Sequence, residues 1–173
     1  MDRFAKIFRI VIEQFEGGFV DDPDDRGGAT KFGISTKFLR EIDDDRNASD
    51  LSYEDAVELA YEHFGLESKF DFLPHGIDFL HFDMAFNAGT KAAGLVLQRT
   101  INANGGNLTK DGIVGPITLG QVDKATVIEY TIQRAWRYLY YVQNRQNKSA
   151  LNNWTYGRRL KWLYSFLINW KYI

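Results

Sequence analysis

A chain of 173 residues, 45% of them hydrophobic and 15% aromatic, is large enough to bury one compact core, which excludes a disordered protein. It has no cysteine, so a disulfide scaffold and thiol catalysis are excluded, and its net charge of −2 makes nucleic acid a poor partner. No apolar run reaches the about 18 residues that a transmembrane helix needs, so stable membrane insertion is not expected.

Residues 3–16 are predicted to form an amphipathic helix. Glu16 continues a row of apolar side chains that repeats every four residues, through Phe4, Phe8 and Ile12, so we expect its carboxyl on the buried side. Gly17 and Gly18 then end the helix. A carboxyl partly removed from water favours its protonated form, which makes Glu16 a candidate general acid. The alternative is a glutamate at a helix end that faces solvent.

The loop after this helix concentrates negative charge. Four carboxylates fall within five residues, at Asp21, Asp22, Asp24 and Asp25. Like charges this close repel one another unless a ligand or a reaction uses them. A calcium loop starting at Asp22 would put its glycine at Gly27, but Arg26 and Gly33 would then occupy ligand positions. A catalytic loop, a solvated turn and a calcium-dependent module remain as alternatives.

The rest of the chain is predicted to be mainly α-helical. Residues 52–55 resemble a capping box at the start of a helix. Periodic apolar residues predict further helices over 78–88, 90–103 and 124–146, and glycines predict a loop over 104–119. The only β structure that we expect is a short hairpin near residues 19–34.

Charge is distributed unevenly along the chain. All 23 acidic residues lie at or before Glu129, whereas eight of the 21 basic residues follow it, so residues 130–173 carry a charge of +8. Such a tail either binds anions or pairs with the acidic part of the chain. Three of its tryptophans recur every eight residues, at Trp154, Trp162 and Trp170, a spacing that favours core packing over a sugar-binding surface. The three histidines lack the spacing of a zinc site, so we expect no metal and no other cofactor.

The run EGGFVDDPDDRGGATKFGIS, residues 16–35, resembles the signature of the glycoside hydrolase family 108 muramidases. These proteins occur as phage endolysins and as bacterial proteins described as secretion activators. Three later segments match the second half of such proteins, which is described as peptidoglycan-binding: residues 86–89, 97–98 and 111–119. The resemblance implies a lysozyme-like single globular domain with two helical lobes, a catalytic lobe over 1–89 and a peptidoglycan-binding-like lobe over 90–173.

The resemblance also implies site residues. The glutamate of the EGG motif is the catalytic acid of the family, which selects Glu16. In related phage lysozymes an aspartate nine residues on and a threonine soon after it hold a water, which selects Asp25 and Thr30 and implies inversion. Asp22 competes with Asp25 and is otherwise a substrate contact. The chain departs from the family at Phe19, where tyrosine is common, and at two loop residues, Asp21 and Arg26.

We therefore expect an N-acetylmuramidase that cleaves the β-1,4 bond between N-acetylmuramic acid and N-acetylglucosamine. Asn87 and Gln98 are candidate substrate-binding residues, because their amides suit sugar hydroxyl and N-acetyl groups. The expected partner is a peptidoglycan glycan strand and the expected state a monomer. The N-terminus lacks a secretory pattern, so we expect synthesis in the cytoplasm and action on the bacterial wall, in the periplasm, after holin-like release or lysis. The alternative is a wall-binding or secretion-assisting protein with little hydrolytic activity.

Overall fold

The computed structural model describes residues 2–21, 28–144, 159–162 and 165. The chain forms two compact units, Met1–Gly65 and Leu66–Ile173, which are described here one at a time. The mainly α-helical fold predicted from the sequence is confirmed, and so is a small antiparallel sheet. The predicted division at residue 89 concerns function and remains a prediction. No helix in the described ranges is both long and apolar enough to cross a membrane.

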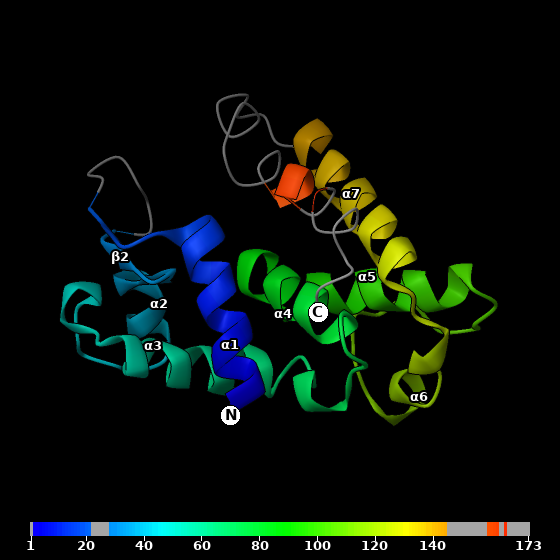
Figure 1. The fold of residues 1–173 in the computed structure, drawn as a ribbon, viewed down its shortest axis with the longest axis horizontal. Helices are drawn as coiled ribbons and strands as arrows, with labels where there is room; N and C mark the ends of the chain where they lie inside the picture. Colours follow the sequence, from blue (N-terminus) through cyan, green and yellow to red (C-terminus); the bar gives the residue numbers. More distant parts are fainter. Residues whose placement is uncertain (1, 22–27, 145–158, 163–164, 166–173) are drawn as a thin grey trace. The chain divides into compact units, whose positions relative to one another are not determined.

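The first unit begins with helix α1, Asp2–Val11, which continues as a π-helical turn, Ile12–Glu16 (Figure 1). The α1 residues Phe4, Phe8 and Val11 are buried, as their spacing predicts. The predicted helix over residues 3–16 is confirmed, but its last turn is π-helical. The Gly17 amide donates to the Ile12 carbonyl oxygen at 2.9 Å, five residues back rather than four.

A three-stranded antiparallel sheet follows, with strands β1 (Phe19–Val20), β2 (Thr30–Lys31) and β3 (Ile34–Ser35) in that order. Thr30 pairs with Val20 on one side and with Ser35 on the other. Phe32 and Gly33 connect β2 to β3, and both have positive φ, at 52° and 75°. Two positive φ values in succession are typical of the type I′ turn that matches strand twist.

Helices α2 (Thr36–Glu41) and α3 (Tyr53–Ala60), with a 3₁₀ turn at Ala48–Asp50 between them, complete this unit together with a second π-helical turn, Tyr61–Gly65. The predicted capping box is confirmed, because the Ser52 hydroxyl accepts from the Asp55 amide at 3.0 Å and the Asp55 carboxylate accepts from the Ser52 amide at 2.8 Å. A Cβ at Gly65 would lie 3.1 Å from the Phe4 ring, so the missing side chain lets α1 pack closely.

The second unit is built around α4, Ile77–Ala88, in which every residue from Ile77 to Ala85 is buried. Helix α5, Thr90–Ala103, packs against α4 and against α7, Val127–Asn144 (Figure 1). Short helical segments lie before α4 (Phe70–Phe72) and between α5 and α7 (α6, Pro116–Leu119, and Val122–Lys124), and residues 159–162 are also helical. The predicted loop over 104–119 therefore ends in one helical turn, which Pro116 begins.

A buried charge cluster joins the elements of the second unit. Asp83 of α4 is fully buried and contacts the guanidinium groups of Arg134, on α7, and Arg159. Burial alone would raise the pKa of Asp83, but the two positive charges outweigh it and lower the pKa. Of the two uses considered for the basic tail, these arginines show pairing with the acidic part of the chain. Trp162 packs against Phe79 with ring centroids 5.4 Å apart, whereas Trp154 and Trp170 lie outside the described residues.

Candidate active site

Glu16 is the last residue of the π-helical turn and is half-buried. The apolar row before it is buried, with Phe4 at 1%, Phe8 at 0% and Ile12 at 6% exposure. An α-helix would place residue 16 directly above Ile12, but the wider turn places Gly17 in hydrogen-bonding register with Ile12 instead. We expected the Glu16 carboxyl on the buried side of the helix, but the residue is only half-buried. It lies at the boundary between the core and solvent, where a proton donor can meet a substrate.

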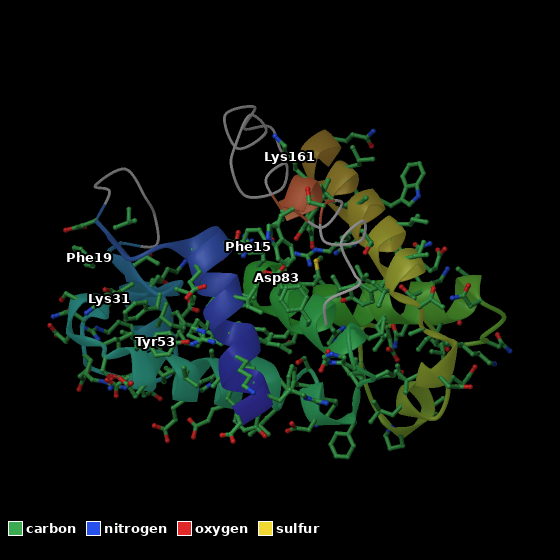
Figure 2. All side chains as sticks on the ribbon, viewed as in Figure 1. Phe15, Phe19, Lys31, Tyr53, Asp83 and Lys161 are labelled. Carbon is green, nitrogen blue, oxygen red and sulfur yellow. The ribbon has the colours of Figure 1, made fainter. Side chains whose placement is uncertain are left out.

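The sheet begins three residues after Glu16 and presents an open apolar edge. Both residues of β1 are exposed, Phe19 at 50% and Val20 at 54% (Figure 2). An exposed aromatic ring three residues after a candidate acid suits stacking on a sugar ring. Phe19 was noted in the sequence as a departure from the family, and its exposure is what makes it a candidate substrate contact.

Thr30 lies on the central strand of the same sheet and is half-buried. Its hydroxyl donates to the Gly28 carbonyl oxygen at 3.3 Å, which leaves the hydroxyl oxygen able to accept a bond from water. The Nζ of neighbouring Lys31, which is labelled in Figure 2, donates to the Ser49 carbonyl oxygen at 2.9 Å and so ties the strand to the 3₁₀ turn at Ala48–Asp50. The unit thus contains both Glu16, on the turn that precedes β1, and Thr30, on the strand that pairs with β1.

Asp22 and Asp25 lie outside the described residues, so the separation between Glu16 and the second carboxylate stays a prediction. The same holds for inversion and for the calcium-dependent alternative, since three of the four clustered aspartates belong to that segment. Within the described part of the chain no group of three or more His, Asp or Glu side chains is arranged to hold a metal ion.

The two remaining predicted site residues belong to the second unit and make internal contacts. The Asn87 amide oxygen accepts from the Tyr138 hydroxyl at 3.1 Å, and the residue is half-buried at the end of α4. Gln98 is 1% exposed and bonds the following loop three times, to Asp111, Gly112 and Ile113, at 2.7 to 3.1 Å. The bond from Gln98 lowers the pKa of Asp111 and so favours its carboxylate. These contacts show what the two amides do in the fold, and sugar binding by them stays a prediction.

Residues 9–89 match the family model described as glycosyl hydrolase 108. This segment is similar to a glycosyl hydrolase 108 domain. The resemblance found in the sequence is thereby confirmed, and the matched segment contains Glu16, Phe19 and Thr30. No curated protein sequence matches the chain.

The fold has a solved counterpart. A structure of Brucella abortus SagA matches with a TM-score of 0.76 and 24% sequence identity, over 99% of this chain and 97% of that chain. The likeness is therefore one of fold along nearly the whole length. It shows that the fold of the matched segment and the helical fold after residue 89 are shared with another protein.

Proposed function

We propose that the protein is a peptidoglycan hydrolase, an N-acetylmuramidase that cleaves the β-1,4 bond between N-acetylmuramic acid and N-acetylglucosamine. The observation that carries this proposal is the position of Glu16, half-buried at the end of a π-helical turn, within the segment that matches glycosyl hydrolase 108. π-helical turns occur frequently at functional sites, where they shift a side chain out of the regular helical position.

Glycosidic cleavage needs a proton for the leaving oxygen and a carboxylate or activated water on the opposite face of the sugar. Glu16 would donate the proton. Asp25 and Thr30 would hold the attacking water, with Thr30 accepting a bond from it through the hydroxyl oxygen and Asp22 contacting the substrate. This arrangement predicts inversion, and a carboxylate separation of about 6.5–9.5 Å would agree with it, whereas about 5–5.5 Å would indicate retention.

The exposed edge of β1 gives the substrate a surface. Phe19 would stack on a sugar ring next to the bond that Glu16 protonates. Tyrosine is common at this position in the family, but stacking uses the face of the ring and does not need the hydroxyl group. The reaction would take place on the bacterial cell wall, with Asn87 and the second unit contributing further contacts to the strand.

The test is to incubate the protein with peptidoglycan sacculi and to identify the reducing ends of the released fragments by mass spectrometry. Glu16→Gln keeps the shape of the side chain and removes the proton donor. Glu13→Gln is the matched control, since Glu13 is an exposed glutamate in the same helical turn. We expect reducing N-acetylmuramic acid from the wild type and from Glu13→Gln, and intact sacculi with Glu16→Gln.

The alternative function is wall binding or assistance of secretion without hydrolysis, in which the same fold would hold glycan without cutting it. Intact sacculi with all three proteins, together with retained binding, would favour that function and overturn the proposal.

A further inference from the structure

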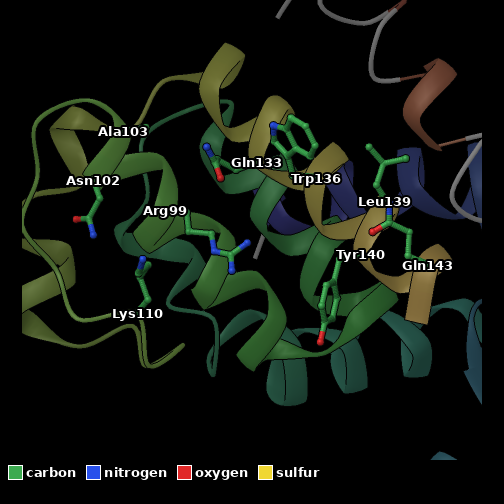
Figure 3. A pocket seen from close by; sticks show the side chains of 9 residues that line it. All are labelled: Arg99, Asn102, Ala103, Lys110, Gln133, Trp136, Leu139, Tyr140 and Gln143. Atoms are coloured by element: carbon green, nitrogen blue, oxygen red, sulfur yellow. The ribbon is translucent and has the colours of Figure 1, made fainter. Parts of the chain in front are cut away.

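A second candidate binding site lies in the second unit, in a groove between α5 and α7 with a volume of about 670 Å³. Arg99 and Asn102 enter it from α5, Gln133, Trp136 and Tyr140 from α7, and Lys110 from the loop that follows α5 (Figure 3). The α7 residues are spaced by three and four, so they form one stripe along the helix. None of the residues predicted from the sequence to bind substrate lines this groove.

The aromatic side chains of the groove are exposed although α7 has a well-buried face of its own. Tyr130, Arg134 and Tyr138 fill that buried face, at 0%, 0% and 1% exposure. On the groove side Trp136 is 61% exposed and Tyr140 is 54% exposed. Trp136 is thus not needed to complete the core in the described part of the chain, and its ring offers an apolar face flanked by amides, which is the composition of a ligand site.

The groove is also positively charged. Arg99 and Lys110 line it, and no carboxylate does. Neither cation forms an ion pair with the residues that the structure describes, in contrast to Arg134 and Arg159, which both pair with Asp83. The nearest acidic residue bonded to a lining side chain is Glu129, which accepts the Gln133 amide at 2.7 Å and so orients it. Unpaired cations in a groove without acids attract an anionic ligand.

We propose that this groove binds the carboxylate-bearing stem peptide of a peptidoglycan strand, together with the N-acetylated sugar that carries it. Arg99 and Lys110 would bind the peptide carboxylates, the former through its planar fork of donors. Trp136 would stack on the sugar, and the amides of Gln133 and Asn102 would bond its acetamido group. The proposal deepens the function proposed above by adding a binding site in the unit that does not contain Glu16, and it rests on peptidoglycan being the substrate.

The experiment measures the binding of a soluble disaccharide-peptide fragment of peptidoglycan by isothermal titration calorimetry, with the full chain carrying Glu16→Gln to prevent turnover. Arg99→Gln combined with Lys110→Gln removes the cations. Lys91→Gln, an exposed lysine on α5 that is not part of the groove, is the matched control. A neutral oligomer of N-acetylglucosamine, which has no carboxylate, is titrated in parallel.

We expect the double variant to bind the fragment at least tenfold more weakly, with Lys91→Gln unchanged, and the neutral oligomer to bind the double variant and its parent alike. Trp136→Ala should weaken the binding of both ligands, and urea unfolding should show that all variants are folded. Unchanged fragment affinity in the double variant would overturn the proposal. So would a groove-dependent affinity for vesicles of anionic phospholipid combined with none for the fragment.

The groove proposal and the hydrolase proposal can fail independently of each other. If sacculi stay intact with the wild type but the groove variants lose fragment binding, the hydrolase proposal fails and the groove stands. If sacculi are cut and the groove variants bind the fragment as the parent does, the groove proposal fails alone.

Discussion

Asp83 and Arg134 form an ion pair in which both side chains are fully buried, joining α4 to α7 across 51 residues of sequence. Arg159 contacts the other oxygen of the same carboxylate at 3.2 Å. One carboxylate therefore holds two buried guanidinium groups. Removing it would leave both positive charges in a region from which water is excluded, and this is far more costly than removing a pair at the surface.

Asp83→Asn should consequently destabilise the second unit by about 3 kcal/mol or more, the cost typical of breaking a buried ion pair. Urea unfolding followed by circular dichroism measures the change. Asp71→Asn, at an exposed position in the same unit, should leave the midpoint nearly unchanged. A midpoint for Asp83→Asn within error of the wild type would show that the buried cluster does not stabilise the fold.

His81 makes stability depend on pH. Burial lowers the pKa of His81 to about 3 from its usual 6.5, and its Nδ1 lies 3.1 Å from the Tyr130 hydroxyl. Below about pH 6.5 the unfolded chain gains a proton here that the folded chain does not, so the free energy of unfolding falls as pH falls toward 3, by up to about 1.4 kcal/mol per pH unit.

The window between about pH 6.5 and pH 4.5 isolates this effect, because most carboxylates titrate below it. Thermal unfolding in that window should show a smaller pH dependence for His81→Asn than for the wild type. Equal slopes for His81→Asn and the wild type would contradict the assignment.

Gly94 of α5 allows the loop after the helix to approach closely. A Cβ at Gly94 would lie 2.1 Å from the carbonyl oxygen of Gly112, a distance that only movement of the backbone can relieve. Gly94→Ala should therefore cost several times the stability lost in Gly115→Ala, where a Cβ would meet nothing within 4 Å. Chemical unfolding of the two variants side by side measures this difference, and similar midpoints would refute the close contact.

Gln98 should prove necessary for the same loop. Gln98→Met removes the acceptor of the part-buried Gly112 amide and is expected to cost about 1 kcal/mol or more. Gln98→Glu restores that acceptor but sets a second carboxylate against Asp111, so it should be destabilising at neutral pH and partly recover as the pH is lowered. If both variants keep the wild-type midpoint while losing affinity for glycan, sugar binding rather than loop anchoring is the function of Gln98.

Phe19 should affect substrate binding without affecting the fold. Because half of its surface is exposed, Phe19→Ala should change stability by no more than about 0.5 kcal/mol. We expect the rate of sacculus solubilisation at low substrate to fall several-fold and to recover in Phe19→Tyr, which keeps the ring. Unchanged rates with Phe19→Ala would exclude the stacking contact.

The sequence predicts most of the helices because each carries its own signal. The capping box at Ser52 and the apolar periodicity of α5 are local patterns, and both appear in the structure where they were expected. The burial of Asp83 could not be predicted in this way, because its partners stand 51 and 76 residues further along the chain. A local pattern gives only the charge of the residue and not its partner.

The same distinction applies to the candidate site. The EGG motif identifies Glu16, and the glycosyl hydrolase 108 match supports the motif. The π-helical turn that sets the position of Glu16 has no signal in the sequence, because Ile12–Glu16 would be equally acceptable in an α-helix. The exposure of Phe19 and the groove lined by Trp136 likewise depend on which face of an element the rest of the fold covers.

The π-helical turn has a consequence for how the domain tolerates change. The turn holds one residue more than an α-helical turn, so the residues that follow it are rotated about the helix axis compared with a continuous α-helix. Residues 2–11 are unaffected, and Phe4 and Phe8 keep their packing. Deleting the exposed Gln14 would remove the surplus residue and let the α-helix run on with its core contacts intact. The Glu16 carboxylate would then be rotated about the helix axis, so a single deletion would redirect the candidate acid while the contacts of Phe4 and Phe8 stay in place.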